Sequence, residues 1–277
     1  MLSVIEVGTA GWGTAAVLML VLWFHQRRTE VAGVVDVAWA WGTGVMGAAF
    51  ALLVAAPEPS RQFLVALLGL GWGVRLGLHL WKRLKQDGED ARYAHMRASA
   101  GAHPQRVMFL FFQVQATWVV LFALPMWAAA ATPGPLTWTD GFGVAIWCTA
   151  LTGEWRADRD LLKFRARPGN AGRVCRDGLW RYSRHPNYFF EWLHWLAYCV
   201  IAIGSPYWWV AVGVAAVIYV FLSHITGIPW AEQQSLRRRG KAYREYQATT
   251  SRFFPWPPRK ARATHLGDEA SCERQPN

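Results

Sequence analysis

The sequence predicts an all-α, polytopic membrane protein with about seven transmembrane helices. Its 277 residues are 53% hydrophobic and include 18 tryptophans. The apolar residues gather in long blocks separated by short basic stretches, which is typical of a chain that crosses a membrane several times. The blocks that contain no Asp, Glu, Lys or Arg are residues 7–24, 37–57, 107–139, 141–153 and 192–231. A further block, residues 62–81, is interrupted only by Arg75.

Each predicted span follows from the length of its block, because a helix needs about 20 residues to cross a bilayer. The last block is long enough for two spans, with a break at Gly204-Ser205-Pro206. The predicted helices therefore cover residues 8–25, 33–54, 63–81, 107–130, 141–158, 188–204 and 207–227.

After the last span, residues 230–250 contain helix formers and an aromatic side at Tyr243 and Tyr246. This pattern predicts a helix that lies against the membrane surface. We expect one membrane domain over residues 1–256, with the motif-bearing half at 141–256. Residues 257–277 have no periodic apolar face and are expected to form a disordered polar tail.

The distribution of positive charge predicts the orientation. With the N-terminus outside, the inner loops and the cytoplasmic C-terminal tail contain 27 of the 29 Lys and Arg residues. Only Arg61 then lies outside, and Arg75 lies within a span. The positive-inside rule is satisfied, so the net charge of +11 is first a sign of topology. We expect membrane lipids as partners and no nucleic acid, because the chain has no separate basic domain.

Residues 178–191 form the most informative segment, Gly-Leu-Trp-Arg-Tyr-Ser-Arg-His-Pro-Asn-Tyr-Phe-Phe-Glu. It carries a basic, hydrogen-bonding stretch directly into a hydrophobic block. If Pro186 opens a helix, Asn187 and Glu191 point the same way just inside the membrane, because they are four residues apart. A polar pair in that position is by default a hypothesis for a functional site.

Other polar residues within the predicted spans also fall in the cytoplasmic half. They are Asp36, Arg75, His79, Gln113, Gln115, Glu154, Asp158, His194 and His224. This one-sided placement favours a polar pocket that opens to the cytosol. The alternative interpretation is that these side chains snorkel or cap helix ends. For Asp36 and Arg75 we expect an ion pair between the second and third helices.

The stretch before the central motif is rich in donors, with Lys163, Arg165 and Arg173 leading into Arg181 and Arg184. A pyrophosphate or a 2′-phosphate needs such a density of cations, but juxtamembrane loops are also basic for topology alone. The glycines of residues 69–73 lie in a span without a strand before them, which favours helix packing over a dinucleotide fingerprint. No metal site is expected, because the histidines lack paired ligand spacings.

These motifs together resemble the steroid 5α-reductase-like superfamily. The resemblance lies in the central motif and in the preceding Asp158-x-x-Leu-x-Lys163-x-Arg165. Further similarity lies in residues 34–39, 88–93 and 226–256, and it covers nearly the whole chain up to about residue 260. The chain looks like a bacterial branch of uncharacterised members, so the bacterial inner membrane is the expected location.

The resemblance implies a monomeric enzyme that binds NADPH from the cytoplasmic side. It would reduce a carbon–carbon double bond conjugated to a carbonyl in a hydrophobic, lipid-like small molecule, such as a steroid, an isoprenoid or a fatty compound. Asn187 and Glu191 would hold the nicotinamide carboxamide, since an amide needs both a donor and an acceptor. The cofactor-binding residues that it implies are Asp158, Lys163, Arg165, Arg173, Tyr182, Arg184, His185, Asn187, Tyr188 and Glu191.

The sequence also departs from that superfamily. Steroid reductases polarise the enone with a Gln-Glu pair on the second helix and a Tyr on the third, where this chain offers Asp36, Arg75 and His79. These three are therefore the candidate catalytic residues that would stabilise a developing enolate. A His-His-x-Trp-Tyr element after the last span is replaced by Pro229-Trp-Ala-Glu-Gln-Gln234. The cofactor half of the resemblance transfers better than the catalytic half.

Two other classes remain open. The Arg-His-Pro-x-Tyr motif also resembles isoprenylcysteine and phospholipid methyltransferases, which bind S-adenosylmethionine. That cofactor carries no phosphate, so Lys163, Arg165 and Arg173 favour NADPH. A non-enzymatic lipid-binding or assembly protein would leave the inward polar residues unexplained.

Overall fold

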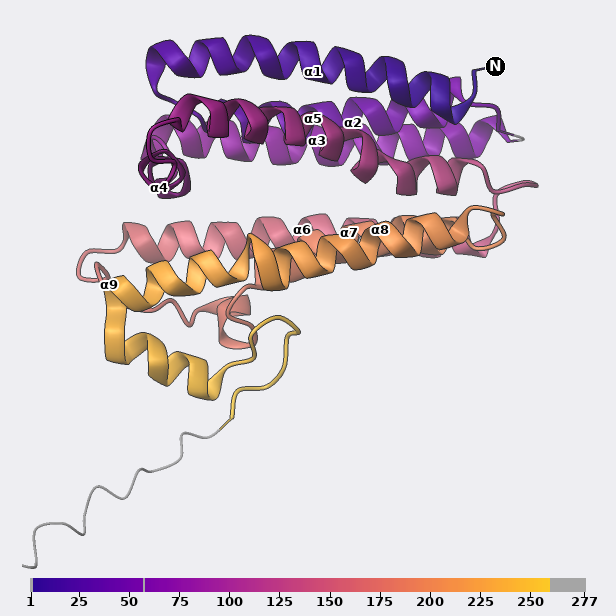
Figure 1. The fold of residues 1–277 in the computed structure, drawn as a ribbon. Helices are drawn as coiled ribbons and strands as arrows, with labels where there is room; N and C mark the ends of the chain where they lie inside the picture. Colours follow the sequence, from indigo (N-terminus) through magenta and orange to yellow (C-terminus); the bar gives the residue numbers. More distant parts are fainter. Residues whose placement is uncertain (1, 57, 260–277) are drawn as a thin grey trace, which may run out of the picture. The chain divides into compact units, whose positions relative to one another are not determined.

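The computed structural model describes residues 2–56 and 58–259, and within them it contains helices and no strands (Figure 1). The helices are α1 Val4–Thr29, α2 Val34–Leu53, α3 Pro59–Asp87, α4 Ala91–Ser99, α5 Pro104–Ala130, α6 Trp138–Ala166, α7 Pro186–Ile201, α8 Trp208–Val220 and α9 Ile228–Thr249. Two short helical turns complete the order, the 3₁₀ turn η1 Gly178–Arg181 and the π turn η2 Phe221–Ile225.

Local chemistry explains where several helices begin and end. Ser3 and Glu6 form a capping box at the start of α1. Asp90 caps α4 by accepting a hydrogen bond from the Arg92 amide at 2.9 Å. Proline opens α7 at Pro186, as the sequence predicts, because its fixed φ suits the first helical turn. Gly88 ends α3 with a positive φ of 73°, a conformation that glycine adopts without strain.

The chain divides into two compact units. The first unit contains Met1–Thr152 and Phe190–Phe221, and the second contains Gly153–Phe189 and Leu222–Asn277. The expectation of a single membrane domain over residues 1–256 stays a prediction.

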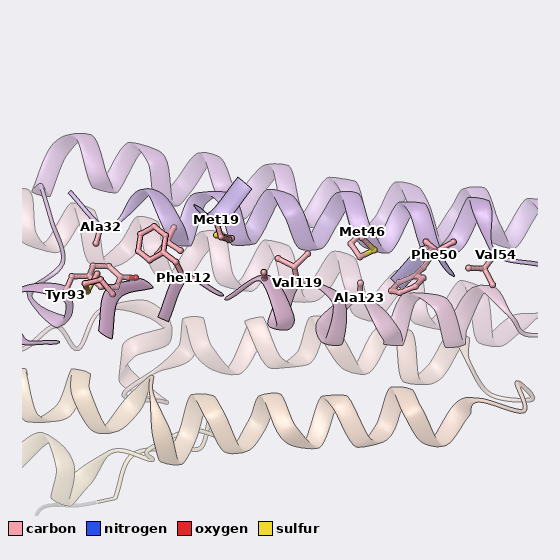
Figure 2. Packing of buried hydrophobic residues seen from close by; sticks show 13 residues of the cluster. Met19, Ala32, Met46, Phe50, Val54, Tyr93, Phe112, Val119 and Ala123 are labelled. Atoms are coloured by element: carbon pink, nitrogen blue, oxygen red, sulfur yellow. The ribbon is translucent and has the colours of Figure 1, made fainter. Parts of the chain in front are cut away.

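In the first unit, α1, α2, α3 and α5 lie side by side, with the short α4 at one end (Figure 1). Their shared core runs along the helices from Tyr93 on α4 to Val54 after α2, as Figure 2 shows. Between these ends it contains Met19, Phe112 and Val119, all at most 2% exposed. Burial of such side chains is the main driving force for packing wherever water would otherwise reach them.

Helices α2 and α3 approach each other closely through glycines. A Cβ atom built on Gly73 would lie 2.9 Å from the Gly44 Cα atom, and one on Gly44 would lie 2.9 Å from the Gly69 carbonyl oxygen. No real side chain tolerates such distances without a shift of the backbone. The structure therefore confirms the interpretation of residues 69–73 as a helix-packing motif.

Five helical segments among the described residues are long and apolar enough to cross a membrane. They are Val4–Thr29, Val34–Leu53, Pro59–Gln86, Pro104–Ala130 and Trp208–Thr249. Helix α7 has 16 residues and is therefore only about 24 Å long, short of the roughly 30 Å of a hydrocarbon core. Helix α6 bears charges throughout its second half, from Glu154 to Arg165. The predicted count of seven spans thus goes beyond what these helices show.

A buried ion pair joins the starts of α3 and α6 in the first unit. Arg61 donates to both carboxylate oxygens of Asp140 at 2.8 Å, and its remaining donors bind the carbonyl oxygens of Thr132, Gly134 and Pro135. The Arg61 side chain is 1% exposed. A desolvated guanidinium is tolerated here because every side of it has an acceptor.

The remaining element predictions fare differently. The break at Gly204-Ser205-Pro206 is confirmed, because α7 ends at Ile201 and α8 begins at Trp208. The helix expected over residues 230–250 is α9, in which Tyr243 and Tyr246 are buried and Gly240 introduces a kink with φ of 47°. Helix α4 was not predicted. The expected disorder of residues 257–277 concerns a segment that lies outside the described residues from 260 onward.

Candidate functional site

In the first unit, two indole groups hold the carboxylate of Glu191. Trp72 on α3 donates from Nε1 to Oε2 at 3.0 Å, and Trp195, one turn further along α7, donates from Nε1 to Oε1 at 3.2 Å. Each carboxylate oxygen can accept more than one hydrogen bond. Glu191 is thus oriented by two rigid aromatic donors, one on each carboxylate oxygen.

His194 lies beside this carboxylate and is completely buried. Its ring stacks on Trp72, with centroids 4.8 Å apart and planes 9° from parallel, and its Nε2 atom lies 3.3 Å from the Tyr198 hydroxyl. The Nδ1 atom is buried and has no hydrogen-bond partner among the described residues. Buried polar atoms are normally paired, so this nitrogen is where a bound polar group would be expected to dock.

Aromatic rings enclose the cluster. Trp39 on α2 meets Trp72 edge to face at 6.0 Å, and Phe122 on α5 meets Trp195 at 5.9 Å. The Trp39 indole nitrogen and the Thr43 hydroxyl, one turn apart on α2, are also buried without a hydrogen-bond partner in the described part of the chain. Such apolar surroundings strengthen any polar contact made inside them. We call Trp72, Glu191, His194, Trp195 and Tyr198 the aromatic cluster.

Asp36, a predicted catalytic residue, is bound by α4. It accepts hydrogen bonds from the Tyr93 hydroxyl at 2.6 Å and from Arg92 Nη2 at 3.2 Å. Burial raises the pKa of Tyr93 well above its ordinary value, so the hydroxyl retains the proton that it donates. The expected ion pair between Asp36 and Arg75 was wrong, because an unpredicted helix supplies the cation.

Arg75 and His79, the other predicted catalytic residues, lie on α3 about one and two turns after Trp72. The Arg75 charge acts on His194, which places it toward the aromatic cluster. The structure therefore associates Arg75 with His194, and Asp36 with α4. Nothing in the geometry tests a role for His79.

In the second unit, the Arg-His-Pro stretch is tied to α9 through Glu232. Arg184 donates from Nε to Glu232 Oε1 at 2.7 Å and from Nη1 to the carbonyl oxygens of Gln247 and Thr250. His185 Nε2 lies 3.4 Å from the same Glu232 oxygen. Sequence reasoning missed Glu232, although its place three residues after Pro229 in a conspicuous motif was a signal.

The same stretch is also anchored by hydrogen bonds to backbone carbonyl groups. The Ser183 hydroxyl donates to the Phe253 carbonyl at 2.8 Å, and the Arg184 amide donates to the Ser251 carbonyl at 2.8 Å. Burial lowers the pKa of His185, although the Glu232 carboxylate opposes that shift. Arg184 and His185 thus have structural partners, and their part in cofactor binding stays a prediction.

Asn187 lies in the first turn of α7, and its Oδ1 atom is buried without a hydrogen-bond partner among the described residues. Next to it, the Tyr188 ring stacks on His185 with centroids 5.6 Å apart and planes 8° from parallel. The side-chain oxygen of Asn187 is therefore an available acceptor in an otherwise well-packed turn. This is the property that a carboxamide-binding residue needs.

The predicted phosphate-binding cations lie on the surface of the second unit. Lys163 and Arg165 are exposed in the last turn of α6, and Arg173 is exposed in the following loop. Tyr182 is 41% exposed, and Asp158 is half-buried on α6. These side chains are accessible to a ligand, as a phosphate site requires. Basic loops that serve only to set the membrane topology would be exposed in the same way.

The long apolar helices indicate an integral membrane protein. More particularly, the chain belongs to the family described as "Protein of unknown function (DUF1295)", which matches residues 22–250 and so includes both units. This family is associated with steroid 5α-reductase-like proteins. No curated protein matches the chain.

Proposed function

We propose that the protein is an NADPH-dependent membrane reductase that acts on a carbon–carbon double bond conjugated to a carbonyl. The observation that carries the proposal is the aromatic cluster, in which two indoles fix the Glu191 carboxylate beside a buried, unpartnered His194 nitrogen. A purely structural cluster would be expected to pair that nitrogen. The association of the family with steroid 5α-reductase-like proteins supports the same class.

The second unit offers the groups that a phosphorylated dinucleotide needs. The unpartnered Asn187 oxygen can accept a hydrogen bond from a carboxamide, and Lys163, Arg165 and Arg173 are exposed side chains of the charge that phosphates need. These residues fit NADPH better than S-adenosylmethionine, which carries no phosphate. When bound, NADPH would supply the hydride.

The first unit offers the groups that polarise a carbonyl. Arg75 carries a guanidinium group, which can stabilise negative charge on an enolate oxygen. Asp36, held by Arg92 and Tyr93, is better suited to fixing α4 against α2 than to donating a proton. Arg75 therefore replaces Asp36 as the first candidate for electrophilic assistance, with His194 as a second donor.

A lipid-like substrate suits the surface between α2 and α3. An apolar groove of about 340 Å³ lies there, lined by Trp41, Gly44, Val45, Leu70, Gly73, Val74 and Leu78. An acyl or isoprenoid chain could lie in such a groove, since its walls offer almost no polar surface. The groove is a feature of the first unit, which also contains Arg75.

The proposal includes the topology. Seven spans with the N-terminus outside would place the basic loops and the C-terminal tail in the cytoplasm, as the positive-inside rule requires. The bacterial inner membrane, a cytoplasmic active site and a monomeric state belong to the same proposal. The short α7 and the charged α6 would then cross as helices packed within the protein.

Calorimetry on protein in nanodiscs, with NADPH, NADH and S-adenosylmethionine side by side, tests the cofactor. We expect NADPH to bind more tightly than NADH, because only NADPH has the 2′-phosphate. Asn187→Ala and Glu191→Ala should each weaken both nucleotides, and the exposed Gln233→Ala serves as the control. Binding of S-adenosylmethionine alone would instead indicate a methyltransferase, and binding of none of the three would favour a non-enzymatic protein.

A further inference from the structure

A basic pocket opens in the second unit. One of the residues that line it, Arg181, belongs to the cation-rich stretch before the central motif, and none is among the residues implied to bind NADPH. Its volume is about 470 Å³, and it is lined by Arg176, Arg181, Thr249, Thr250, Pro258 and Arg259. Three of these six residues are arginines, and none is acidic. The pocket therefore has the composition of an anion site.

Hydrogen bonds of the backbone hold its walls in place. The Arg259 amide donates to the Thr249 carbonyl at 2.8 Å, which returns the chain to the end of α9. The Trp256 amide donates to the Tyr182 carbonyl at 2.9 Å, which fixes the same segment against the residue after η1. The pocket is thus formed between three mutually bonded segments and exists before any ligand binds.

The arginines have no acidic partners within residues 2–56 and 58–259. Arg176 lies over the ring of Tyr246, 5.5 Å from its centroid, and Arg181 and Arg259 are exposed. The neighbouring acid Asp177 is paired with Arg167 at 2.8 Å. Mutual repulsion of three guanidinium groups is relieved when an anion binds between them.

The side chains of these arginines are not needed to cap α9. The Thr249 carbonyl already accepts from the Arg259 amide, and the Thr250 carbonyl accepts from Arg184 Nη1 at 2.7 Å. The Tyr246 carbonyl accepts from the Thr250 amide at 2.9 Å. The side-chain forks of Arg181 and Arg259 therefore stay available to a ligand in solution or at a membrane surface.

We propose that this pocket binds a phosphate group through the forks of Arg181 and Arg259, with Arg176 held beside them by Tyr246. Planar guanidinium groups match phosphate oxygens in bidentate geometry and bind them more strongly than single ammonium groups do. Two sources share this chemistry, a phospholipid headgroup and a small soluble phosphate compound. The site is independent of the proposed reductase activity.

Two measurements on the full chain, the first in uncharged detergent and the second after release from lipid nanodiscs, separate the sources. Calorimetry with inorganic phosphate tests the soluble source, and native mass spectrometry of protein released from phosphatidylglycerol or phosphatidylcholine nanodiscs tests the lipid. We expect Arg181→Ala/Arg259→Ala to weaken the bound species by about tenfold or more, since each charge-assisted hydrogen bond contributes substantially. Phosphate binding alone identifies a soluble ligand, and retention of phosphatidylglycerol alone identifies a lipid headgroup.

The matched control is Arg237→Ala/Arg238→Ala, which removes the same charge from exposed positions of α9 outside the pocket. We expect this control to change the affinity by less than about twofold, because diffuse surface charge contributes little to a bidentate site. Arg181→Lys/Arg259→Lys, which keeps the charge, should give an intermediate loss and guards against a folding defect. Equal loss in both alanine variants, or no binding of either probe by the wild type, would overturn the proposal.

Discussion

At the residue scale, Glu191 and Arg184 show two ways of keeping a charge inside a helical protein. Glu191 is oriented by two indole N–H groups, which donate to its two carboxylate oxygens. Arg184 directs Nε and Nη1 at internal acceptors and so joins the Arg-His-Pro stretch to α9. The first arrangement uses aromatic donors inside the first unit and the second links two segments of the second unit, although both residues belong to one sequence motif.

Arg75 offers the sharpest test of the proposed chemistry. We expect Arg75→Met to lower the turnover of an enone substrate by about 10²–10³, the usual effect of removing one donor that stabilises a developing oxyanion. Substrate affinity should change much less. The measurement is kcat and KM for a panel of lipid-like enones, with Arg83→Met on the exposed end of α3 as the control. Unchanged turnover in both Arg75→Met and Asp36→Asn would remove both residues from the mechanism.

His185 predicts a dependence of stability on pH. Its pKa is lowered in the folded protein by burial, so the folded state keeps the ring neutral while an unfolded chain takes up a proton below about pH 6.5. His185 therefore costs no stability above about pH 6.5, and the free energy of unfolding falls as the pH drops below that value. The groups that face the ring are Glu232, Arg184 and Arg252.

Thermal unfolding between about pH 8 and pH 5 checks this expectation. The wild type should lose more stability on acidification than His185→Gln, which cannot take up that proton. The exposed His103→Gln supplies the control, and its profile should follow that of the wild type. Identical profiles for His185→Gln and the wild type would show that this ring does not determine the acid response.

At the element scale, close packing of α2 against α3 depends on the absence of side chains. Gly44 and Gly73 face each other, and the Gly69 carbonyl lies over Gly44. On the other side of the unit, α1, α2 and α5 pack through larger side chains such as Met19, Phe112 and Val119 (Figure 2). Small residues thus permit one contact, and large ones fill the other.

Replacing Gly73 by alanine should therefore destabilise the first unit. The new Cβ atom would meet the Gly44 Cα and the Ala40 carbonyl at 2.9 and 3.0 Å, so α2 and α3 must separate. We expect a loss of about 1–3 kcal/mol, the usual cost of overpacking a well-packed site. Thermal unfolding in detergent measures it.

Gly13→Ala provides the matched control for Gly73→Ala. It lies within α1, and a Cβ atom there would meet nothing within 4 Å. The same change should leave the melting temperature unaltered or slightly higher, since alanine is the better helix former. An equal loss in both variants would mean that the contact between α2 and α3 does not determine the result.

At the scale of the whole molecule, the chain combines five apolar helical segments with two compact units, and the family to which it belongs spans both. The basic residues are concentrated in the second unit and in the segment around α4. This separation of apolar and basic segments is the basis of the proposed topology. It predicts opposite exposure for two loops that adjoin the same helix.

Those loops flank α6. In a cysteine-free background, a single cysteine at Pro135, before α6, should react with an impermeant reagent from the outside of the cell. One at Arg167, just after α6, should react only after the membrane is opened. Both positions are exposed, so accessibility is not limited by burial. Labelling of both from one side would refute the seven-span topology and with it the cytoplasmic orientation of the basic loops.

Much of the architecture could be predicted without coordinates. The apolar blocks located the helices, Gly204-Ser205-Pro206 located the break between α7 and α8, and the glycines of residues 69–73 indicated a helix contact. Each of these depends on the local properties of a segment. Hydropathy, proline and glycine act through neighbouring residues, so a linear sequence contains the information.

The partners of the polar side chains were decided only by the tertiary structure. Asp36 pairs with Arg92 and Tyr93, not with Arg75, and Glu191 meets Trp72, which lies 119 residues earlier in the chain. Such pairings depend on how each helix is rotated about its axis and how far it slides along its neighbour. Those two quantities are determined by the packing of all the helices in the unit together, so no segment of the sequence specifies them alone.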